Sequence, residues 1–433
     1  MLYVTFVQII SINMKVIDKK MFIIYNLGYE CAFIKIFFKE KQMEKEKQTQ
    51  TVKPQEEKFV KAVSKGTFIT IAVFVALFGY LGSVMGIDKV FGVMFKTGFD
   101  VLINTSFYIM AVAILAGACS SIWSEFGVIA LVNKLLSPLM RPLFGLPGAA
   151  AMGAVTTYVS DNPAILALAE DPGYDKYFTP AEKVTHTNFG TTFGMGLIVT
   201  TYMLGLGKEY FLATLIGNIA AILGGVISCR LVLRAAKKYY HEDRKFKVEV
   251  SDKNDPTVSM RKIRSGGTFE RTFSAMMDGA RSGVSLGLAC APGTVLICTL
   301  VMILTFGPSG ENGQYMGVAY EGVRLLPKLA APLLPITKVL FGFVNSEVVV
   351  FPLTALGAVG SAMGLTKGLL EAGFANAHTV AVFIGMGICW SGFFSTHIGM
   401  LNTLGHDKFI KTSIGYHIVG GLCAGVIANY LYL

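Results

Sequence analysis

The chain alternates between long apolar stretches and short polar breaks. Apolar segments at residues 66–86 and 101–120 are long enough to cross a bilayer as helices. A longer one starts near Ser274 and runs to Phe306, and we expect Pro292 to interrupt it. This pattern predicts an all-α polytopic membrane protein. The further expected spans are 186–206, 209–233, 374–401 and 408–432.

Two glycine-rich apolar stretches, 145–170 and about 338–366, are each interrupted by a polar triplet that contains one acidic residue. Both are too broken for one straight helix, and non-helical backbone at membrane depth survives only when it is buried in protein or lines a cavity. We therefore expect a re-entrant hairpin from each stretch. Proline-bounded helices precede both, at residues 122–144 and 322–337. The two triplets are Ser160-Asp161-Asn162 and Asn345-Ser346-Glu347.

The two halves of the chain resemble each other. Residues 206–217 share six identities with residues 404–415 at an offset of 198. The glycine-methionine-glycine sequence at 194–196 recurs at 385–387, and the two acidic triplets match at an offset of 186. The order of these matches predicts two structural repeats with short insertions in the second.

The distribution of Lys and Arg predicts the topology. The region before residue 66 and the segment 234–271 are rich in basic residues, whereas the loop 307–321 contains none. Basic segments beside spans usually stay in the cytoplasm. We therefore expect a multi-pass protein of the cytoplasmic membrane with a cytoplasmic N-terminus. If 66–86 is an additional leading helix, the two repeats have opposite orientations, which is common among secondary transporters.

Composition supports a membrane protein and excludes several other classes. Of the 433 residues, 53% are hydrophobic and only 15% are charged. The net charge of +10 comes largely from segments that flank spans, so we do not expect nucleic-acid binding. The seven cysteines lack metal-ligand spacing, and no phosphate-binding loop or hydrolase motif occurs, so we expect no cofactor and no enzyme activity.

These patterns predict four parts of the chain. Residues 1–65 form a cytoplasmic tail, of which 1–42 look like an upstream start before Met43. Residues 66–233 hold the leading helix and the first repeat. Residues 234–271 form a basic cytoplasmic linker, and residues 272–433 form the second repeat.

The acidic triplets are the candidate binding site. Asp161 and Glu347 could bind a proton or Na⁺, or accept hydrogen bonds from a substrate. Alternatively, each carboxylate caps a half-helix. Asn162 and Asn345 offer amide groups to a polar ring system, with capping as the alternative. The triplets also include the hydroxyl groups of Ser160 and Ser346. The expected secondary lining residues, each of which could instead be a hydrogen-bonded helix contact, are His186, Asn188 and His378, with His378 at the place comparable to His186.

The two hairpin sequences, LLSPLMRPLFGLPGAAAMGAVTTYVSDNPAI and KVLFGFVNSEVVVFPL, resemble the two copies of the Gate, or nucleoside-recognition, domain. Concentrative nucleoside transporters, the membrane domain of the ferrous-iron transporter FeoB and some spore-maturation membrane proteins share this domain. The match is closest to stand-alone bacterial Gate proteins of the YjiH type. The resemblance implies two inverted Gate repeats, a mid-membrane site between the hairpins and cation coupling. There is no GTPase domain, and the first hairpin lacks the glutamine pair expected in nucleoside transporters.

We therefore expect a secondary transporter for a small polar metabolite, nucleoside-like or another nitrogenous compound, coupled to Na⁺ or H⁺. One alternative is a non-transporting Gate-fold partner in sporulation or envelope assembly, with the linker as its docking surface. Another is an exporter of a small aromatic dicarboxylate. The lipid bilayer and a small-molecule substrate are the expected partners, and relatives suggest a homo-oligomer. Substrate, coupling ion and direction do not follow from the sequence.

Overall fold

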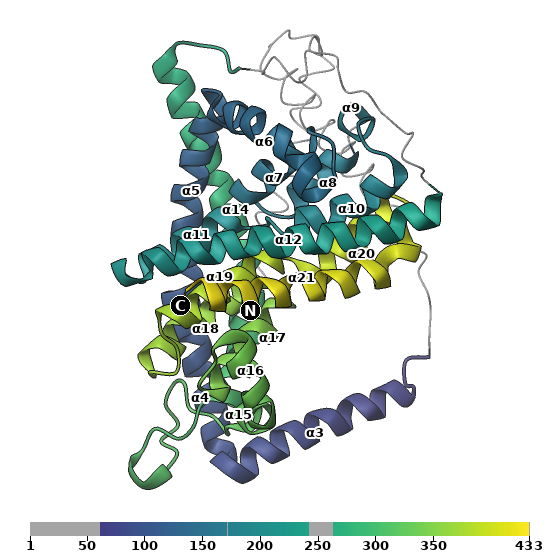
Figure 1. Cartoon of the computed structure of the whole chain (residues 1–433). Helices are drawn as coiled ribbons and strands as arrows, with labels where there is room; N and C mark the ends of the chain where they lie inside the picture. Colours follow the sequence, from purple (N-terminus) through teal and green to yellow (C-terminus); the bar gives the residue numbers. More distant parts are fainter. Residues whose placement is uncertain (1–60, 171, 242–262, 433) are drawn as a thin grey trace, which may run out of the picture. The chain divides into compact units, whose positions relative to one another are not determined.

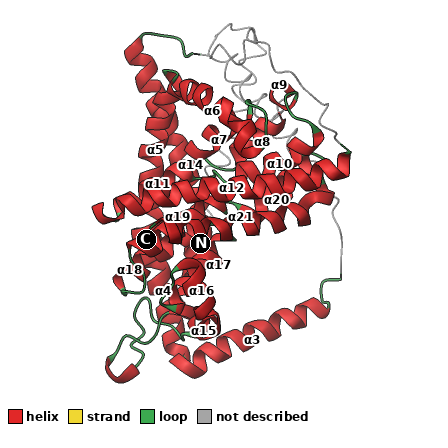
Figure 2. Ribbon diagram, viewed as in Figure 1, coloured by secondary structure: helices red, strands yellow, loops and turns green. Residues whose placement is uncertain are grey.

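The computed structural model of the protein describes residues 61–170, 172–241 and 263–432. Within these ranges every regular element is a helix, which confirms the all-α expectation (Figure 2). The chain divides into two units, Met1–Val73 and Phe74–Leu433, and the boundary falls inside α3 (Lys65–Met85). The expected start at Met43 lies outside the described residues, as do residues 242–262 of the expected linker.

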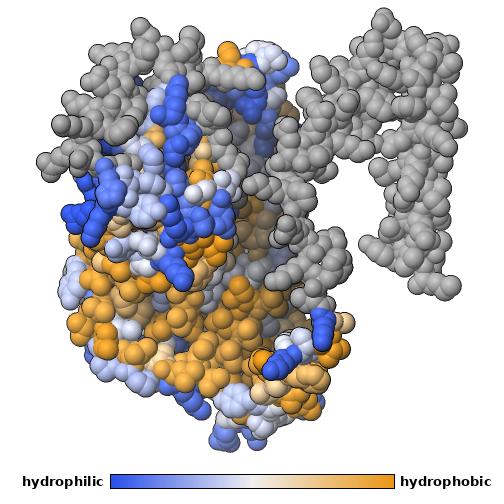
Figure 3. All heavy atoms as spheres, turned by 90° about the vertical axis from the view of Figure 1, so that its right-hand side faces the viewer, coloured by the Kyte–Doolittle hydropathy of each residue, from blue (hydrophilic) through white to orange (hydrophobic). Residues whose placement is uncertain are grey.

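Five helical runs in the described ranges are long and apolar enough to cross a membrane. Many of their large apolar side chains face outward, and Figure 3 shows a broad area of hydrophobic side chains on one face with hydrophilic ones beyond it. Lipid can cover such a surface, so the chain is a multi-pass membrane protein. The five runs are Lys65–Met85, Ile87–Glu125, Lys208–Tyr240, Thr268–Thr305 and Asp407–Leu431.

Two of these runs differ from the expectation. The expected span 101–120 is the middle of a longer helix made of α4 (Ile87–Asp100), η1 (Val101–Ser106) and α5 (Phe107–Glu125). The expected interruption at Pro292 is wrong, because α14 (Thr268–Thr305) continues through it. Proline removes one backbone donor, and the remaining hydrogen bonds of a 38-residue helix in tight contact with neighbours outweigh that loss.

Two other expected spans are pairs of short helices. Residues 186–206 contain the end of α10 (Pro180–Thr191) and α11 (Gly196–Gly205), and residues 374–401 contain α19 (Ala377–Cys389) and most of α20 (Phe393–Thr403). The residues before α11 and α20, Met195 and Gly392, have left-handed backbone conformations with φ of 54° and 61°. A left-handed residue stops a right-handed helix, and apolar composition does not reveal it.

The long helices pack through small residues. α12 (Phe211–Tyr240) and α21 (Ile410–Leu431) lie side by side, and α19 packs against both (Figure 1). A Cβ added to Gly224 of α12 would lie 2.5 Å from the carbonyl oxygen of Gly420 in α21. The crossing of α5 and α14 is equally close, since a Cβ on Gly117 would lie 2.5 Å from the carbonyl oxygen of Gly279. Small residues let transmembrane helices approach to backbone contact.

The first hairpin region begins with α6 (Val128–Phe144), followed by α7 (Ala150–Val159), α8 (Pro163–Glu170) and α9 (Pro172–Asp175). The helix ladder is interrupted at residues 160–162, as the first triplet predicted. An exposed leucine occurs at every fourth position along α6, which is typical of a helix that lies at a membrane interface. These leucines are Leu131, Leu135, Leu139 and Leu143.

The second hairpin region has two breaks where the sequence predicted one. The first, at residues 342–345, bends the chain by 78° between Leu325–Phe341 and Ser346–Ala355, and the second lies at residues 356–358. The helices of this region are α15 (Leu325–Ala330), η4 (Ala331–Leu333), α16 (Leu334–Phe341), η5 (Ser346–Val349), α17 (Val350–Ala355) and α18 (Val359–Glu371). Short 3₁₀ turns elsewhere are η2 (Lys208–Tyr210), η3 (Glu311–Gly313) and η6 (Asp407–Phe409).

The helix boundaries correct the register between the two halves. α6 and α16 both end on Phe followed by a left-handed glycine, Gly145 and Gly342, which is an offset of 342 − 145 = 197. The N-caps of α10 and α19, Thr179 and Asn376, also differ by 376 − 179 = 197. A left-handed glycine and an N-cap are fixed by backbone geometry, whereas shared acidic residues are not. The offset of 186 between the triplets is therefore wrong.

In the corrected register the first acidic triplet corresponds to the second break of the second hairpin region. Asp161 then matches Ala358, and Glu347 matches Ala150 at the start of α7. His378 matches Ala181 and is not comparable with His186. The opposite orientation of the two halves stays a prediction.

Candidate functional site

Four helix breaks meet at one cavity of about 440 Å³, which we call the central cavity. Asp161 and Asn162 come from the break between α7 and α8, and Met195 from the break between α10 and α11. Residues 357–361 contribute the break between α17 and α18, and Gly392 the break between α19 and α20. Interrupted helices expose backbone groups to a ligand, so this cavity is the candidate binding chamber.

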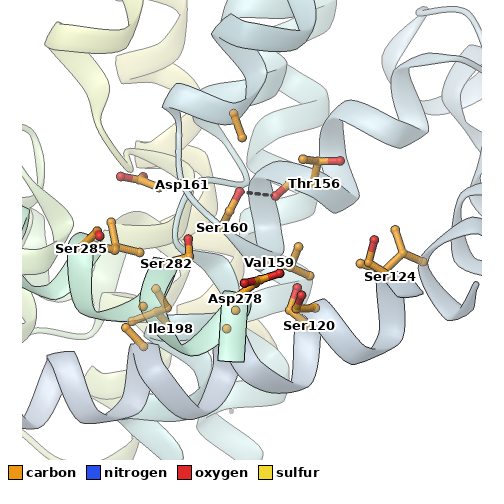
Figure 4. Close-up of a pocket in the computed structure, with 18 residues that line it drawn as sticks. Ser120, Ser124, Thr156, Val159, Ser160, Asp161, Ile198, Asp278, Ser282 and Ser285 are labelled. Atoms are coloured by element: carbon orange, nitrogen blue, oxygen red, sulfur yellow. Dashed lines mark hydrogen bonds between the residues drawn. The ribbon is translucent and has the colours of Figure 1, made fainter. Parts of the chain in front are cut away.

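A second cavity of about 630 Å³ lies between the first hairpin and the crossing of α5 and α14, and we call it the serine cavity. Figure 4 shows hydroxyl groups from all three elements directed around it, with Asp161 and Asp278 on its wall. Asp161 and Leu286 line both cavities, so the two cavities adjoin at this point. The hydroxyl-bearing lining residues are Ser120, Ser121, Ser124, Thr156, Ser160, Ser282 and Ser285.

Ser160 and Asp161 are held by local hydrogen bonds. The Ser160 hydroxyl donates to the carbonyl oxygen of Thr156 at 2.5 Å, which closes the end of α7 (Figure 4). The Asp161 carboxylate accepts from the backbone N–H of Asn162 at 2.7 Å. Among the described residues Asp161 forms no ion pair. Asp161 lines both cavities.

Asn162 is wedged between two other helix breaks. Its side chain is 5% exposed, and its Nδ2 lies 3.4 Å from the Ser391 hydroxyl. A Cβ on Gly194 would lie 2.2 Å from Asn162 Oδ1, and one on Gly392 would lie 2.0 Å from Nδ2. The buried Oδ1 has no hydrogen-bond donor among the described residues. A buried carbonyl oxygen without a donor is costly, which makes it a candidate cation ligand.

The second triplet lies elsewhere. Glu347 is buried, and its carboxylate pairs with Arg324 at 3.3 Å and accepts from the Ser346 hydroxyl at 3.4 Å. Asn345 donates through Nδ2 to the carbonyl oxygen of Phe374 at 2.9 Å. None of the three residues lines the central or serine cavity. The structure thus places Ser160, Asp161 and Asn162 together at the cavities and the second triplet outside both, at the bend before η5.

The expected secondary lining residues are part of the helix packing. His186 lies among aromatic rings, with its Nε2 3.1 Å from the Tyr174 hydroxyl. His378 is half-buried, and its Nε2 lies 2.9 Å from Asn429 Oδ1. Neither these histidines nor Asn188 lines either cavity.

Asn188 is the centre of a buried hydrogen-bond network that joins four helices. Its Nδ2 donates to the Ser228 hydroxyl at 2.9 Å and to the carbonyl oxygen of Ser413 at 3.0 Å. Ser228 in turn lies 2.8 Å from His417 Nδ1, and Asn188 Oδ1 lies 3.2 Å from His397 Nε2. All these residues are fully buried, so the network ties α10, α12, α20 and α21 into one body.

An ion cluster lies at the linker end of α14, next to the serine cavity. Glu125 is 4% exposed and accepts from Arg264 Nη1 and Arg271 Nε, both at 2.7 Å. Arg264 also reaches Asp278 at 3.0 Å, and Arg281 approaches the same carboxylate at 3.4 Å. The hydrogen bond to Glu125 is the main cause that raises the pKa of Arg264 above its usual range.

Sequence reasoning missed the serine cavity and the second hairpin tip. The serines of α5 and α14 are spaced by three or four residues, which was a readable signal for one polar face on each helix. Residues 357–361 carry no charge and gave no such signal. Their place at the central cavity follows from the break between α17 and α18.

Comparisons with known proteins found one sequence relative and several similar solved structures. The sequence matches no model of a known protein family. It is 26% identical over 131 residues to an uncharacterised protein of Alkalihalophilus pseudofirmus, and the match covers 29% of this chain and only 28% of that relative.

Solved structures of CNTnw, a concentrative nucleoside transporter, are similar over most of the chain. Its inward-facing substrate-bound state shares 16% identity, covers 86% of this chain and 87% of its own, and has a TM-score of 0.49. An outward-facing variant of the same protein shares 14% identity over 84% of each chain, with a TM-score of 0.47.

Proposed function

We propose that the protein is a secondary transporter that moves a small polar solute, nucleoside-like or another nitrogenous compound, across the cytoplasmic membrane. The observation that carries this proposal is the meeting of four helix breaks at the central cavity. Broken helices around a mid-membrane cavity are typical of secondary transporters, because they present backbone donors and acceptors without a full loop in lipid. The resemblance of the two hairpin sequences to the nucleoside-recognition domain supports this choice of solute class.

Asp161 and Asn162 are the proposed recognition residues. A carboxylate without an ion pair accepts hydrogen bonds from hydroxyl, amide or amine groups of a solute. The central cavity volume of about 440 Å³ falls within the usual range for small-molecule sites. No Lys or Arg of the described ranges lines either cavity, which disfavours an aromatic dicarboxylate as the solute.

The coupling cation is proposed to bind beside Asn162. Its buried Oδ1 lacks a donor among the described residues, and the helix breaks at Gly194 and Gly392 lie directly against the Asn162 side chain. Oxygen ligands suit Na⁺, and a proton could instead be carried by Asp161. Dependence of uptake on Na⁺ or on a pH gradient distinguishes the two.

The experiment is uptake into proteoliposomes for a panel of radiolabelled nucleosides, nucleobases and related amines, with and without a Na⁺ or pH gradient. Solutes are also screened for their effect on the melting temperature of the purified protein. We expect Asp161→Asn to lower uptake of the positive solute at least tenfold and to abolish its thermal stabilisation, because the variant loses its charged acceptor. Glu371→Gln removes an exposed carboxylate outside the cavities and is the control.

Unchanged transport and unchanged thermal stabilisation in Asp161→Asn would remove this residue from the site. A protein that neither takes up nor binds any solute of the panel, and that retains partners only when residues 234–271 are present, would favour the scaffold alternative.

A further inference from the structure

One face of α14 lines both cavities in succession. Asp278, Ser282 and Ser285 face the serine cavity, Leu286 faces both, and Cys290 faces the central cavity. Spacings of three and four residues place side chains on one helical face. At 1.5 Å per residue, the 12 residues from Asp278 to Cys290 correspond to a path of about 18 Å along the helix.

This path begins at the linker end of α14. Asp278 is in the third turn of a helix that starts at Thr268, directly after the linker, whereas Cys290 is near its middle. A solute that enters from the linker side would therefore meet the serine cavity first and the central cavity second.

Among the described residues, the charged side chains that line the two cavities are all acidic. Asp161 and Asp278 are the charged lining residues of the serine cavity, and Asp161 is the charged lining residue of the central cavity. Seven Ser and Thr residues line the serine cavity, and their hydroxyl groups can donate to or accept from a neutral polar solute.

The two carboxylates differ in how far their charge is compensated. Asp278 is half-exposed, and Arg264 and Arg281 lie 3.0 Å and 3.4 Å from its oxygens. Asp161 accepts one backbone hydrogen bond at 2.7 Å and has no cationic partner among the described residues. The field at the junction of the cavities therefore comes mainly from Asp161, because no nearby cation compensates its charge.

We propose that the serine cavity is an anion-excluding vestibule to the central cavity, and that Asp161 at the junction sets its charge selectivity. This inference rests on the proposed transport function and narrows its solute class to neutral or cationic compounds that form several hydrogen bonds. Anions of the same size as these compounds are repelled before they reach the central cavity.

The test uses Cys290 as a reporter inside the central cavity. In the full-length protein, Cys31, Cys119 and Cys423 are replaced by serine, while the buried Cys229, Cys298 and Cys389 remain. Membrane vesicles with the linker side outward are treated with cationic, neutral or anionic methanethiosulfonates of similar size. Each rate is normalised to the reaction of that reagent with a free thiol. A Ser282→Cys variant provides a second reporter in the vestibule itself.

We expect the cationic reagent to modify Cys290 about tenfold faster than the anionic one, since one uncompensated charge at the junction supplies an effect of this order. Asp161→Asn should bring this ratio close to one, and Asp161→Glu should keep it. Asp278→Asn should change the ratio less than twofold, because Arg264 and Arg281 already compensate this carboxylate. A melting curve of each variant checks that it is folded.

A ratio near one in the parent protein, or a ratio that Asp161→Asn leaves unchanged, overturns the charge selectivity. Two other results would refute the claim that the serine cavity leads to the central cavity. One is labelling of Cys290 only from the opposite side of the membrane. The other is a neutral reagent that labels Ser282→Cys but not Cys290. Charge-selective labelling in a protein without solute uptake would refute the transport function and keep the vestibule. Solute uptake without charge-selective labelling would refute the charge selectivity of the vestibule and leave the transport function standing.

Discussion

At the scale of single residues, Glu321 shows how one carboxylate can organise a whole loop. It is fully buried and accepts from the backbone N–H groups of Met316 and Gly317 at 2.8 Å and 2.7 Å. It also accepts from the Ser309 hydroxyl at 2.6 Å. Burial raises the pKa of Glu321, but the hydrogen bonds from Met316 and Ser309 outweigh burial, so the pKa lies below its usual value.

We predict that Glu321→Gln loosens the loop between α14 and α15. The glutamine side chain is uncharged, so it is a weaker acceptor than the carboxylate, and its NH₂ group faces backbone N–H groups that are also donors. The expected loss of local stability is about 2–3 kcal/mol. Hydrogen exchange at Met316 and Gly317 should become faster by one to two orders of magnitude. Glu311→Gln, which changes an exposed carboxylate in the same loop, is the matched control.

The same carboxylate makes the loop sensitive to acid. Because the folded pKa is lowered, the stabilisation is complete above the ordinary value of 4.5 and is lost as the pH falls through the folded pKa. Exchange of these amides, corrected for the intrinsic pH dependence, should therefore accelerate below about pH 4.5. Acceleration on raising the pH from 5 to 8 would contradict this account.

The locations of Asp161 and Glu347 could be predicted from the sequence only in part. Asp161 lies at a helix break, as predicted, and Glu347 lies in the 3₁₀ turn that directly follows one, because a polar triplet in apolar sequence is a poor continuation of a helix. Their equivalence was wrong, since the left-handed glycines Gly145 and Gly342 set a different register. Placement of the second triplet at a binding site stays a prediction.

At the scale of elements, the network around Asn188 holds four helices together. We predict that Asn188→Leu destabilises the protein by about 2–4 kcal/mol, because it leaves the buried His397 Nε2 without its partner and removes the hydrogen bonds to Ser228 and Ser413. The melting temperature in detergent should fall by about 5 °C or more. Asn133→Leu is the control, since the Asn133 Oδ1 already lacks a partner and the substitution should cost little. Equal melting temperatures for the two variants would contradict the prediction.

Most long helices could be predicted from apolar length, whereas the short ones could not. The spans at 66–86, 209–233 and 408–432 correspond to α3, α12 and α21. α10 and α11, like α19 and α20, form one apolar stretch in sequence, and only their backbone conformations separate them. Hydropathy measures transfer to lipid and does not record a single left-handed residue.

At the scale of the whole molecule, the distribution of basic residues predicts a cytoplasmic linker and an external loop at residues 307–321. We predict that Asn312→Cys reacts with a membrane-impermeant maleimide only from outside the cell, and that Asn254→Cys reacts only from the cytoplasmic side. Both variants carry serine at Cys31, Cys119, Cys290 and Cys423 so that the background is low. Labelling of both positions from one side would refute the predicted topology.

The sequence alone determined that this protein crosses a membrane several times as helices, that two of its hairpin regions are interrupted, and that Asp161 lies at a break. These features depend on the transfer of side chains between water and lipid, which composition and order record directly. Tertiary structure decided that breaks from four distant segments meet at one cavity, and that Asp161 faces it while Glu347 pairs with Arg324. Such contacts depend on backbone dihedral angles and on helix packing through glycine, which no local stretch of sequence encodes.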